Sequence, residues 1–355
     1  MSNFDAFKSV VGFINDHFDG EKVPVLDSFS NSGKKVLLKI RGLTVEFRVP
    51  RGILRAVDNL DLEVYENEVL GLVGESGCGK SVLAHTILKL VDPNGRIAGG
   101  EIFFQDKDVL SLKRRKLRKY RWEDVSIIFQ GAFNSLNPVM KVFEHMVDTT
   151  LAHEKATKEE ILNRSTQLLQ VMRLDADAVL DRYSHELSGG MKQRVIGSMA
   201  LLLKPKLLIL DEPCSALDML TQKFFLKMLA DMRKETRTSM IFITHDLAQV
   251  AEVADRVAVM YGGVIVEIGD AENIFYRPKH PYTKALLNSI PSIVGDISKL
   301  KPLPGPLPDP VNPPPGCEFH PRCPYASGIC SKVRPKLEQV EGDWLIACHR
   351  WREID

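Results

Sequence analysis

The sequence predicts an α/β fold built around a glycine-rich strand-to-helix turn, with a helical segment inserted into the strand-rich part. The first observation is the apolar run 69–73, which reads as a buried strand and leads through a glycine-rich turn into an amphipathic helix at 81–90. The second is that further apolar runs read as buried strands that end in polar residues. The third is a pair of helical patterns at 158–174 and 191–203, which interrupt the strands.

The composition is that of an ordinary globular protein with room for two or more domains. Of 355 residues, 44% are hydrophobic and 26% are charged. The net charge of +1 gives no electrostatic reason to propose nucleic acid as a partner. No apolar run approaches the roughly eighteen residues of a membrane span, and the start of the chain does not resemble a signal peptide. We therefore expect a cytoplasmic protein.

Residues 1–34 are expected to form an N-terminal extension, a short amphipathic helix followed by a linker. Three aspartates on its polar face disfavour attraction to anionic lipid. Docking of this helix on protein is thus the favoured interpretation, and binding to a membrane surface is the alternative.

The runs 36–49 and 60–73 are strand-like, and 50–52 forms the turn between them. The basic run 113–119 reads as a solvated helix face, and a short nucleic-acid patch is the less favoured interpretation.

The turn after residues 69–73 has the spacing of a phosphate-binding loop, Gly74-x4-Gly79-Lys80-Ser81. Its glycines let successive N–H groups point at one anion, and the helix that follows adds the positive end of its dipole. Lys80 can reach the β- and γ-phosphates, and the Ser81 hydroxyl suits Mg²⁺. An ordinary glycine-rich turn is a much weaker alternative. The predicted ATP-binding residues of this segment are Gly74, Glu75, Ser76, Gly77, Cys78, Gly79, Lys80, Ser81 and Val82.

Polar side chains stand at the ends of three further predicted strands. Gln130 follows 125–129, and its amide could ligate Mg²⁺ or a water molecule. Asp211 is placed to hold Mg²⁺ through water, and Glu212 to polarise an attacking water. His245 ends another apolar run; a lone histidine is more often structural, but this one follows the same strand-end pattern.

A second anion site is predicted where residues 187–194 read LSGGMKQR. A serine hydroxyl and two glycines at the start of a helix offer bare N–H groups and a dipole end. With the phosphate loop, this segment resembles the ATP-binding cassette (ABC) family, whose signature motif is LSGGQ. The signature residues are Leu187, Ser188, Gly189, Gly190 and Met191, the last standing where most members have Gln.

The resemblance implies an ABC-type P-loop NTPase fold with a RecA-like core, an antiparallel β subdomain, an inserted helical subdomain at about 133–205 and a Pro/Cys-rich C-terminal extension. It also implies that two cassettes pair head to tail, so that each ATP lies between the phosphate loop of one and the signature helix of the other. The same resemblance implies roles for single residues. Phe47 stacks on adenine, Glu212 is the catalytic base and His245 is the switch histidine. Gln130 is the Q-loop residue, Asp218 belongs to the D-loop, and Mg²⁺ is bound by Ser81, Gln130 and Asp211.

The segments 274–287, 302–315 and 316–323 resemble the ATPases of oligopeptide and dipeptide transporters. Proline at the density of 302–315 makes a stiff extended spacer, which we expect to wrap over the cassette. The predicted domains are thus the N-terminal extension, an ABC ATPase domain at 35–291 and a C-terminal domain at 292–355.

Four cysteines crowd the C-terminal domain without the C-x2-C pairs that are usual for zinc: Cys317, Cys323, Cys330 and Cys348. Members of the group with these cysteines resemble proteins that hold a [4Fe–4S] cluster, so a cluster is favoured over zinc and over free or disulfide-bonded thiols.

The resemblance implies an ATP-hydrolysing, nucleotide-binding subunit of an importer for peptides, or for oligosaccharides or nickel. Its expected partners are a second cassette, identical or paralogous, two permease subunits and, indirectly, an extracytoplasmic binding protein, with no nucleic acid. It would lie peripherally on the cytoplasmic face of the membrane. The alternative is a soluble ABC ATPase that acts on nucleic acid or ribosomes.

Overall fold

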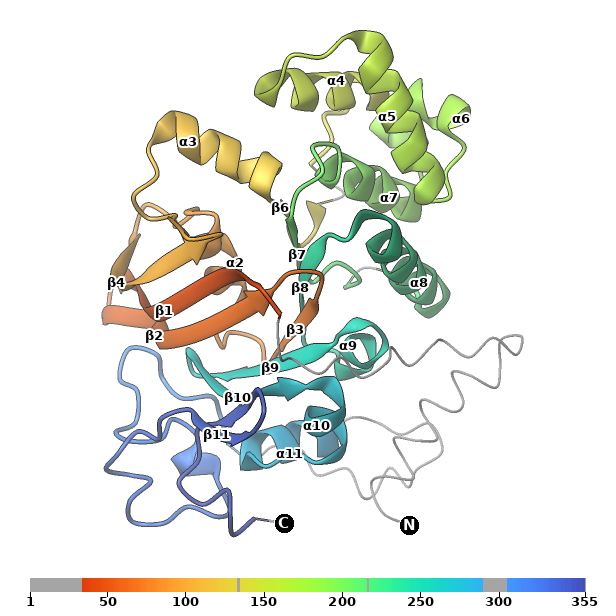
Figure 1. The fold of residues 1–355 in the computed structure, drawn as a ribbon. Coiled ribbons are helices and arrows are strands. Elements are labelled where there is room, and N and C mark those ends of the chain that lie inside the picture. The colour runs from red at the N-terminus through yellow and green to blue at the C-terminus, as the bar shows by residue number, and fades with distance from the viewer. Residues whose placement is uncertain (1–33, 133–134, 216, 290–304, 355) are drawn as a thin grey trace.

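The computed structural model describes residues 34–132, 135–215, 217–289 and 305–354. The helix expected in the N-terminal extension lies outside these residues. Two sheets organise the described part (Figure 1). One is a four-stranded antiparallel sheet in the order β2-β1-β4-β5. Its strands are β1 (Val36–Val49), β2 (Gly52–Tyr65), β4 (Gly95–Phe104) and β5 (Lys107–Asp108).

The second sheet has eight strands in the order β11-β12-β10-β9-β3-β8-β7-β6. The strands from β9 to β6 are parallel, whereas β10, β12 and β11 add an antiparallel edge. Their bounds are β3 (Val69–Val73), β6 (Val125–Ile128), β7 (Leu207–Asp211), β8 (Ser239–Thr244), β9 (Arg256–Tyr261), β10 (Val264–Asp270), β11 (Glu338–Glu341) and β12 (Trp344–Ile346).

The parallel strands are buried on both faces, which explains their continuous apolar runs. In β3, Val69 and Val73 face one hydrophobic core, and Leu70 and Leu72 face the other. The first core packs against helices, and the second packs against the four-stranded sheet. The α/β class and the inserted helices that the sequence predicts are confirmed.

Helices form a separate lobe between β6 and β7 (Figure 1). Thr157 begins one of them with a capping box to Glu160, and Asp175 and Ser188 cap two others. The lobe contains α4 (Val142–His153), α5 (Lys158–Val171), α6 (Ala176–Leu180), the short helix Ser184–Glu186 and α7 (Gly189–Ala200). The other helices are α2 (Lys80–Ile87), α3 (Arg114–Lys119), η1 (Tyr120–Asp124), α8 (Met219–Thr236), α9 (Leu247–Val253), α10 (Ala271–Tyr276), α11 (Pro281–Asn288) and the turn His320–Arg322.

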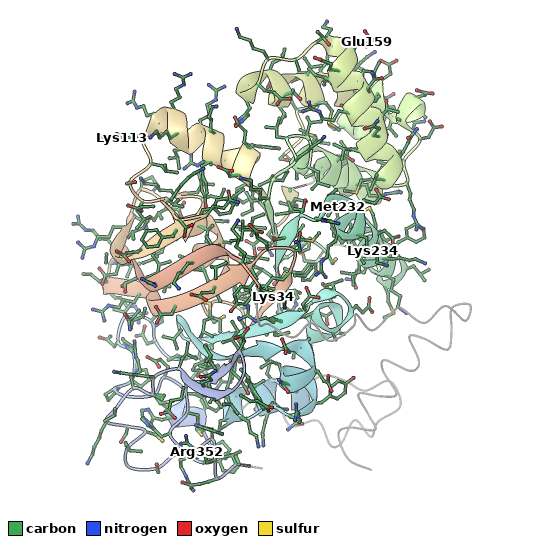
Figure 2. The ribbon with its side chains drawn as sticks, viewed as in Figure 1. Lys34, Lys113, Glu159, Met232, Lys234 and Arg352 are labelled. Atoms are coloured by element: carbon green, nitrogen blue, oxygen red, sulfur yellow. The ribbon has the colours of Figure 1, made fainter. Side chains whose placement is uncertain are left out.

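Several expectations about element bounds are wrong. The run 60–73 is not one strand, because Asn67 at φ 60° turns the chain and sends β3 into the other sheet. The strand that contains Leu60 begins at Gly52, which was expected in the turn, because residues from Gly52 onward pair with β1. The predicted helices 158–174 and 191–203 run from Lys158 to Val171 and from Gly189 to Ala200. The helix after the phosphate loop ends at Ile87 and not at residue 90, because Lys89 has φ 56°. The basic run 113–119 is largely exposed on and before α3, with Lys113 at the periphery in Figure 2, as expected for a solvated face.

The C-terminal part returns to the core. Strand β12 pairs with β10, so residues after 292 extend the large sheet. The prolyl segment lies along the β1–β2 hairpin, where the Arg55 N–H donates to the Pro310 carbonyl at 3.0 Å and Arg51 pairs with Asp309 at 3.3 Å. None of the helices in the described ranges is both long and apolar enough to cross a bilayer.

Candidate functional site

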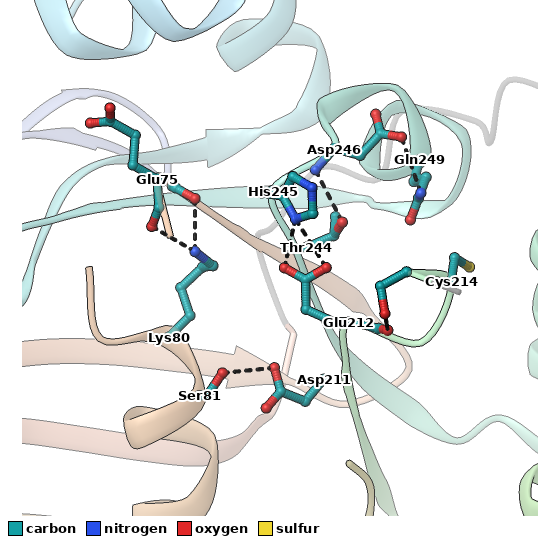
Figure 3. A network of polar contacts seen from close by, with 12 residues as sticks. Glu75, Lys80, Ser81, Asp211, Glu212, Cys214, Thr244, His245, Asp246 and Gln249 are labelled. Atoms are coloured by element: carbon teal, nitrogen blue, oxygen red, sulfur yellow. Dashed lines mark hydrogen bonds and ion pairs between the residues drawn. The ribbon is translucent and has the colours of Figure 1, made fainter. Parts of the chain in front are cut away.

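The strand ends that the sequence singles out meet at one edge of the large sheet. Strands β3, β8 and β7 are parallel neighbours, so the phosphate loop, His245 and the Asp211–Glu212 pair lie side by side (Figure 3). The Ser81 hydroxyl donates to Asp211 Oδ1 at 3.0 Å. His245 Nδ1 lies 2.8 Å from Glu212 Oε1 and 3.0 Å from Oε2. The edge therefore carries a hydroxyl–carboxylate pair beside an imidazole–carboxylate pair.

The phosphate loop encloses the ammonium group of Lys80. This buried side chain donates to the Gly74 carbonyl at 2.7 Å and to the Glu75 carbonyl at 2.9 Å. Its Nζ also lies 3.6 Å from Cys78 Sγ, which is buried, whereas Ser76 and Gly77 are exposed at the tip of the loop. A cation at the start of α2 among loop amides is suited to binding phosphate oxygens.

Two glycines of the loop are required by close backbone contacts as well as by their dihedral angles. A Cβ on Gly74, at φ 153°, would lie 2.2 Å from the Met260 carbonyl oxygen. A Cβ on Gly79, at φ 109°, would lie 2.2 Å from the Ala56 carbonyl oxygen. The loop is thus held between the end of β9 and strand β2, a constraint that its sequence spacing does not reveal.

Burial raises the pKa of Asp211, and the hydrogen bond from Ser81 acts in the opposite direction. His85 Nε2 lies 3.8 Å from Asp211 Oδ2, and the His85 ring contacts Phe129 edge to face at 5.3 Å. Sequence reasoning missed His85, although it stands four residues after Ser81 and therefore on the same face of α2. A buried carboxylate beside a hydroxyl offers the hard oxygen donors that Mg²⁺ prefers.

Glu212 combines a strained backbone with an oriented side chain. Its φ of 51° is rare for a residue that is not glycine, and its N–H donates to the Ile243 carbonyl. Its side chain is 12% exposed, whereas that of His245 is 64% exposed. Gln130 is exposed in the turn after β6, and its neighbours Phe129 and Gly131 line a small pocket with Glu212.

The signature segment packs in the helical lobe. Ser188 is exposed and caps α7, because its Oγ accepts from the Met191 N–H at 3.3 Å. Leu187 is buried, and a Cβ on Gly190 would lie 3.3 Å from Thr221 of α8. Gly189 has open space beside it. The segment thus faces solvent next to α8, with its helix N-terminus accessible.

Two further predicted residues have clear structural settings. Asp218 caps α8, since its carboxylate accepts hydrogen bonds from the Leu220 and Thr221 N–H groups. The pKa of Asp218 is lowered, chiefly because the Thr221 hydroxyl also donates a hydrogen bond to the carboxylate. The Phe47 ring lies on Gly95, where an added Cβ would come within 2.6 Å of it. Its role in adenine binding stays a prediction.

The four C-terminal cysteines line one pocket together with Phe319 and Arg350. All four are free thiols. Burial raises the pKa of Cys317 to about 12 and that of Cys348 to about 11, and neighbouring thiols in the set add to both effects. Among the residues that the structure describes, however, no three cysteine, histidine or acidic side chains are gathered closely enough to hold a metal ion.

Comparison with known proteins agrees with this geometry. Residues 57–215 match the family profile described as ABC transporter. Residues 266–330 match the profile described as oligopeptide/dipeptide transporter, C-terminal region. The chain is 44% identical over 319 residues to the dipeptide transport ATP-binding protein DppD of Caldanaerobacter subterraneus, covering 90% of this chain and 98% of the relative. The chain belongs to the ATP-binding subunits of the oligopeptide/dipeptide ABC transporter group.

Other similarities support the same membership. The oligopeptide transport ATP-binding protein OppD of Escherichia coli is 41% identical, with 88% of this chain and 93% of the relative covered. The solved structure of cbiO1 from Clostridium perfringens, described as part of the ABC transporter complex cbiONQ, has a TM-score of 0.60 at 27% identity and covers 69% of this chain and 92% of its own. This ABC-type ATPase is therefore an importer subunit, and the soluble alternative is not favoured.

Proposed function

We propose that this subunit hydrolyses ATP at a site completed by a second cassette and thereby drives peptide uptake through two permease subunits. The observation that carries the proposal is the gathering of Lys80, Ser81, Asp211, Glu212 and His245 at one sheet edge. The cargo is inferred from relatives that are named dipeptide and oligopeptide transport proteins. An extracytoplasmic binding protein would deliver the peptide, and the subunit would lie peripherally on the cytoplasmic face of the membrane.

In this proposal, some residues of the site bind ATP and Mg²⁺, and others promote hydrolysis. Lys80 and the loop amides hold the phosphates, and Ser81 and Asp211, with Gln130, hold Mg²⁺, which neutralises phosphate charge when bound. Glu212 accepts a proton from the attacking water. His245 orients the Glu212 carboxylate through the 2.8 Å contact and is exposed enough to reach a γ-phosphate.

The head-to-tail pairing that the family resemblance implies agrees with the fold, because the two predicted anion sites are held by different parts of it. The loop site lies at the end of β3, whereas Ser188 caps α7 in the helical lobe. Beside the Asp218 cap, Met219, Leu220 and Phe224 are 69%, 66% and 55% exposed. Apolar exposure next to the predicted D-loop supports pairing with another cassette there.

The decisive experiment uses the complex with its permeases and binding protein in liposomes. We expect ATP-dependent uptake of labelled dipeptide, and we expect Glu212→Gln to bind ATP with unchanged affinity while hydrolysis falls about 100-fold or more, the loss typical of removing a general base. Undiminished hydrolysis by Glu212→Gln would contradict the assigned base. Uptake of nickel or oligosaccharide without dipeptide uptake would contradict the cargo, and co-purification with ribosomes or nucleic acid in place of permeases would contradict the function.

For the C-terminal pocket we propose a [4Fe–4S] cluster held by Cys317, Cys323, Cys330 and Cys348. The support is the set of four thiols that share one pocket, while the conformation described here gathers no metal-holding group. The four cysteine thiolates would bind the iron atoms of the cluster and so tie the C-terminal loops together. Anaerobic purification should give a brown protein with charge-transfer absorption and bound iron and sulfide. A colourless protein with stoichiometric zinc would replace this proposal by the zinc alternative.

A further inference from the structure

The second residue of the phosphate loop is held from the far end of the chain. The Arg322 guanidinium donates to both carboxylate oxygens of Glu75, from Nη1 to Oε2 at 2.7 Å and from Nη2 to Oε1 at 3.1 Å. In addition, the Glu75 N–H donates to the Tyr282 hydroxyl at 2.9 Å. Both partners belong to the region after β10, so the C-terminal part of the fold contacts the nucleotide loop directly.

Glu75 also contacts the cation of the loop. Its backbone carbonyl accepts from Lys80 Nζ at 2.9 Å, while its carboxylate points away from Lys80 (Figure 3). One residue therefore joins the C-terminal partners to the lysine that is suited to binding phosphate. A displacement of Glu75 would move an acceptor of Lys80 together with the loop N–H groups next to it.

The guanidinium of Arg322 is fixed in an aromatic setting. Its side chain is 5% exposed, lies 5.7 Å from the Tyr261 ring centroid and donates to the Tyr261 hydroxyl at 3.3 Å. The rings of Tyr261, Tyr282 and Phe319 pack with centroids 4.6 to 5.4 Å apart. A planar cation that contacts the Tyr261 ring and pairs with both oxygens of the Glu75 carboxylate leaves Glu75 little freedom.

We propose that Arg322 is a positioning residue for ATP binding: it fixes Glu75 and so holds the phosphate loop in its binding conformation. This inference rests on the proposed ATP site at the loop. It makes the segment His320–Arg322, which lies beside the cysteine pocket through Cys323, part of the support of that site. A purely structural role in anchoring the C-terminal part is the competing explanation.

The test measures the Kd of the full-length chain for MgATP, with thermal melting recorded for every variant. We expect Arg322→Gln to raise Kd about tenfold, which corresponds to about 1.4 kcal/mol of binding free energy, because Glu75 loses the bidentate charge-assisted pair that fixes it. Arg322→Lys restores the charge without the bidentate geometry and should recover part of the affinity. Glu75→Gln should weaken binding, and the double variant should be no weaker than Arg322→Gln alone.

The matched control is Arg334→Gln. Arg334 also joins the C-terminal part to the core, through Asp58 at 2.7 Å and through Glu318, but it does not contact the phosphate loop. We expect this variant to lower the melting temperature and to keep the wild-type Kd.

Several outcomes would overturn the inference. They are an unchanged Kd in Arg322→Gln, an equal rise of Kd in Arg334→Gln, and additive effects of Arg322→Gln and Glu75→Gln. If Arg322→Gln does not fold, Arg322→Lys and Glu75→Gln still decide, since wild-type affinity in both would refute the role of the pair. Failure of the wild-type chain to bind MgATP would instead refute the proposed ATP site itself.

Discussion

At the scale of single residues, Asp211 shows how a binding site lowers the stability of the protein that carries it. Its carboxylate is buried, and burial raises its pKa above the ordinary value of 3.8. A carboxyl group that ionises less readily in the folded than in the unfolded chain destabilises the fold at pH values above both pKa values. A bound cation would remove this penalty, because it pairs with the buried charge.

We therefore expect Asp211→Asn to increase the free energy of unfolding of the nucleotide-free protein at pH 7, while it removes the Mg²⁺-dependent part of stabilisation by ATP. For the wild type, MgATP at a hundred times Kd should add about 2.7 kcal/mol. Denaturant unfolding with MgATP and with ATP plus EDTA measures both effects. Equal stabilisation of variant and wild type by MgATP would show that Asp211 does not serve the cation.

At the scale of elements, the junction of α4 with η1 contains a histidine that the fold keeps neutral. Burial lowers the pKa of His153 below 6.5, and the nearby charge of Arg118 acts in the same direction, whereas Glu123 and Glu154 act against it. Nδ1 of His153 is buried without a hydrogen-bond partner, and Glu123 Oε1 lies 3.9 Å away. The ring packs near Trp122 of η1 at 6.4 Å.

This junction should weaken in mild acid. Below pH 6.5 His153 binds a proton in the unfolded chain but stays neutral in the folded chain. Its contribution to the free energy of unfolding is therefore complete above pH 6.5 and is lost as the pH falls towards the pKa of the folded state. The His153→Gln variant has no titrating group at this position, so its free energy of unfolding should depend less steeply on pH. The difference in slope should be a fraction of about 1.4 kcal/mol per pH unit, the limit for one proton. Urea unfolding between pH 7.5 and 5 compares the two proteins; parallel curves would contradict the assignment.

At the scale of the whole molecule, one buried ion pair lies where the two sheets meet, between β9 and the connection from β2 to β3. Arg256 in β9 donates to Glu68 at 3.1 Å and 3.3 Å, and the side chains are 3% and 1% exposed. The same guanidinium donates to the Glu63 carbonyl at 3.3 Å and lies 4.6 Å from the Tyr65 ring centroid. It therefore links the large sheet to the end of β2 in the four-stranded sheet.

Breaking this pair on one side should cost far more than breaking a surface pair. We expect Arg256→Met to lower the free energy of unfolding by about 3–5 kcal/mol, because Glu68 would be left buried and unpaired. Lys35→Met, which breaks the exposed pair with Glu66, should leave the free energy of unfolding almost unchanged. The double variant Arg256→Met with Glu68→Leu should recover most of the loss. Equal urea midpoints for the two single variants would contradict the structural role of the pair.

The phosphate loop and the family could be predicted from the amino-acid sequence alone. The residues that bind an anion through backbone N–H groups, a lysine and a hydroxyl must be contiguous, as in 74–81, so their spacing can be read directly. Residues at the ends of apolar runs, such as Asp211 and His245, were also predictable, because parallel strands align their carboxyl ends at one edge.

The distant side chains that contact the phosphate loop could not be predicted, because they are brought there by the folding of the whole chain. Arg322 and Glu75 are 247 residues apart, and no local sequence pattern predicts a contact between residues so far apart in the chain. The division of 60–73 between two sheets was also not predicted. Its first part alternates apolar and acidic residues and packs on one core, whereas 69–73 is continuously apolar or small and contributes to both cores. Local spacing encodes local chemistry, whereas contacts between remote segments follow from how the whole chain packs.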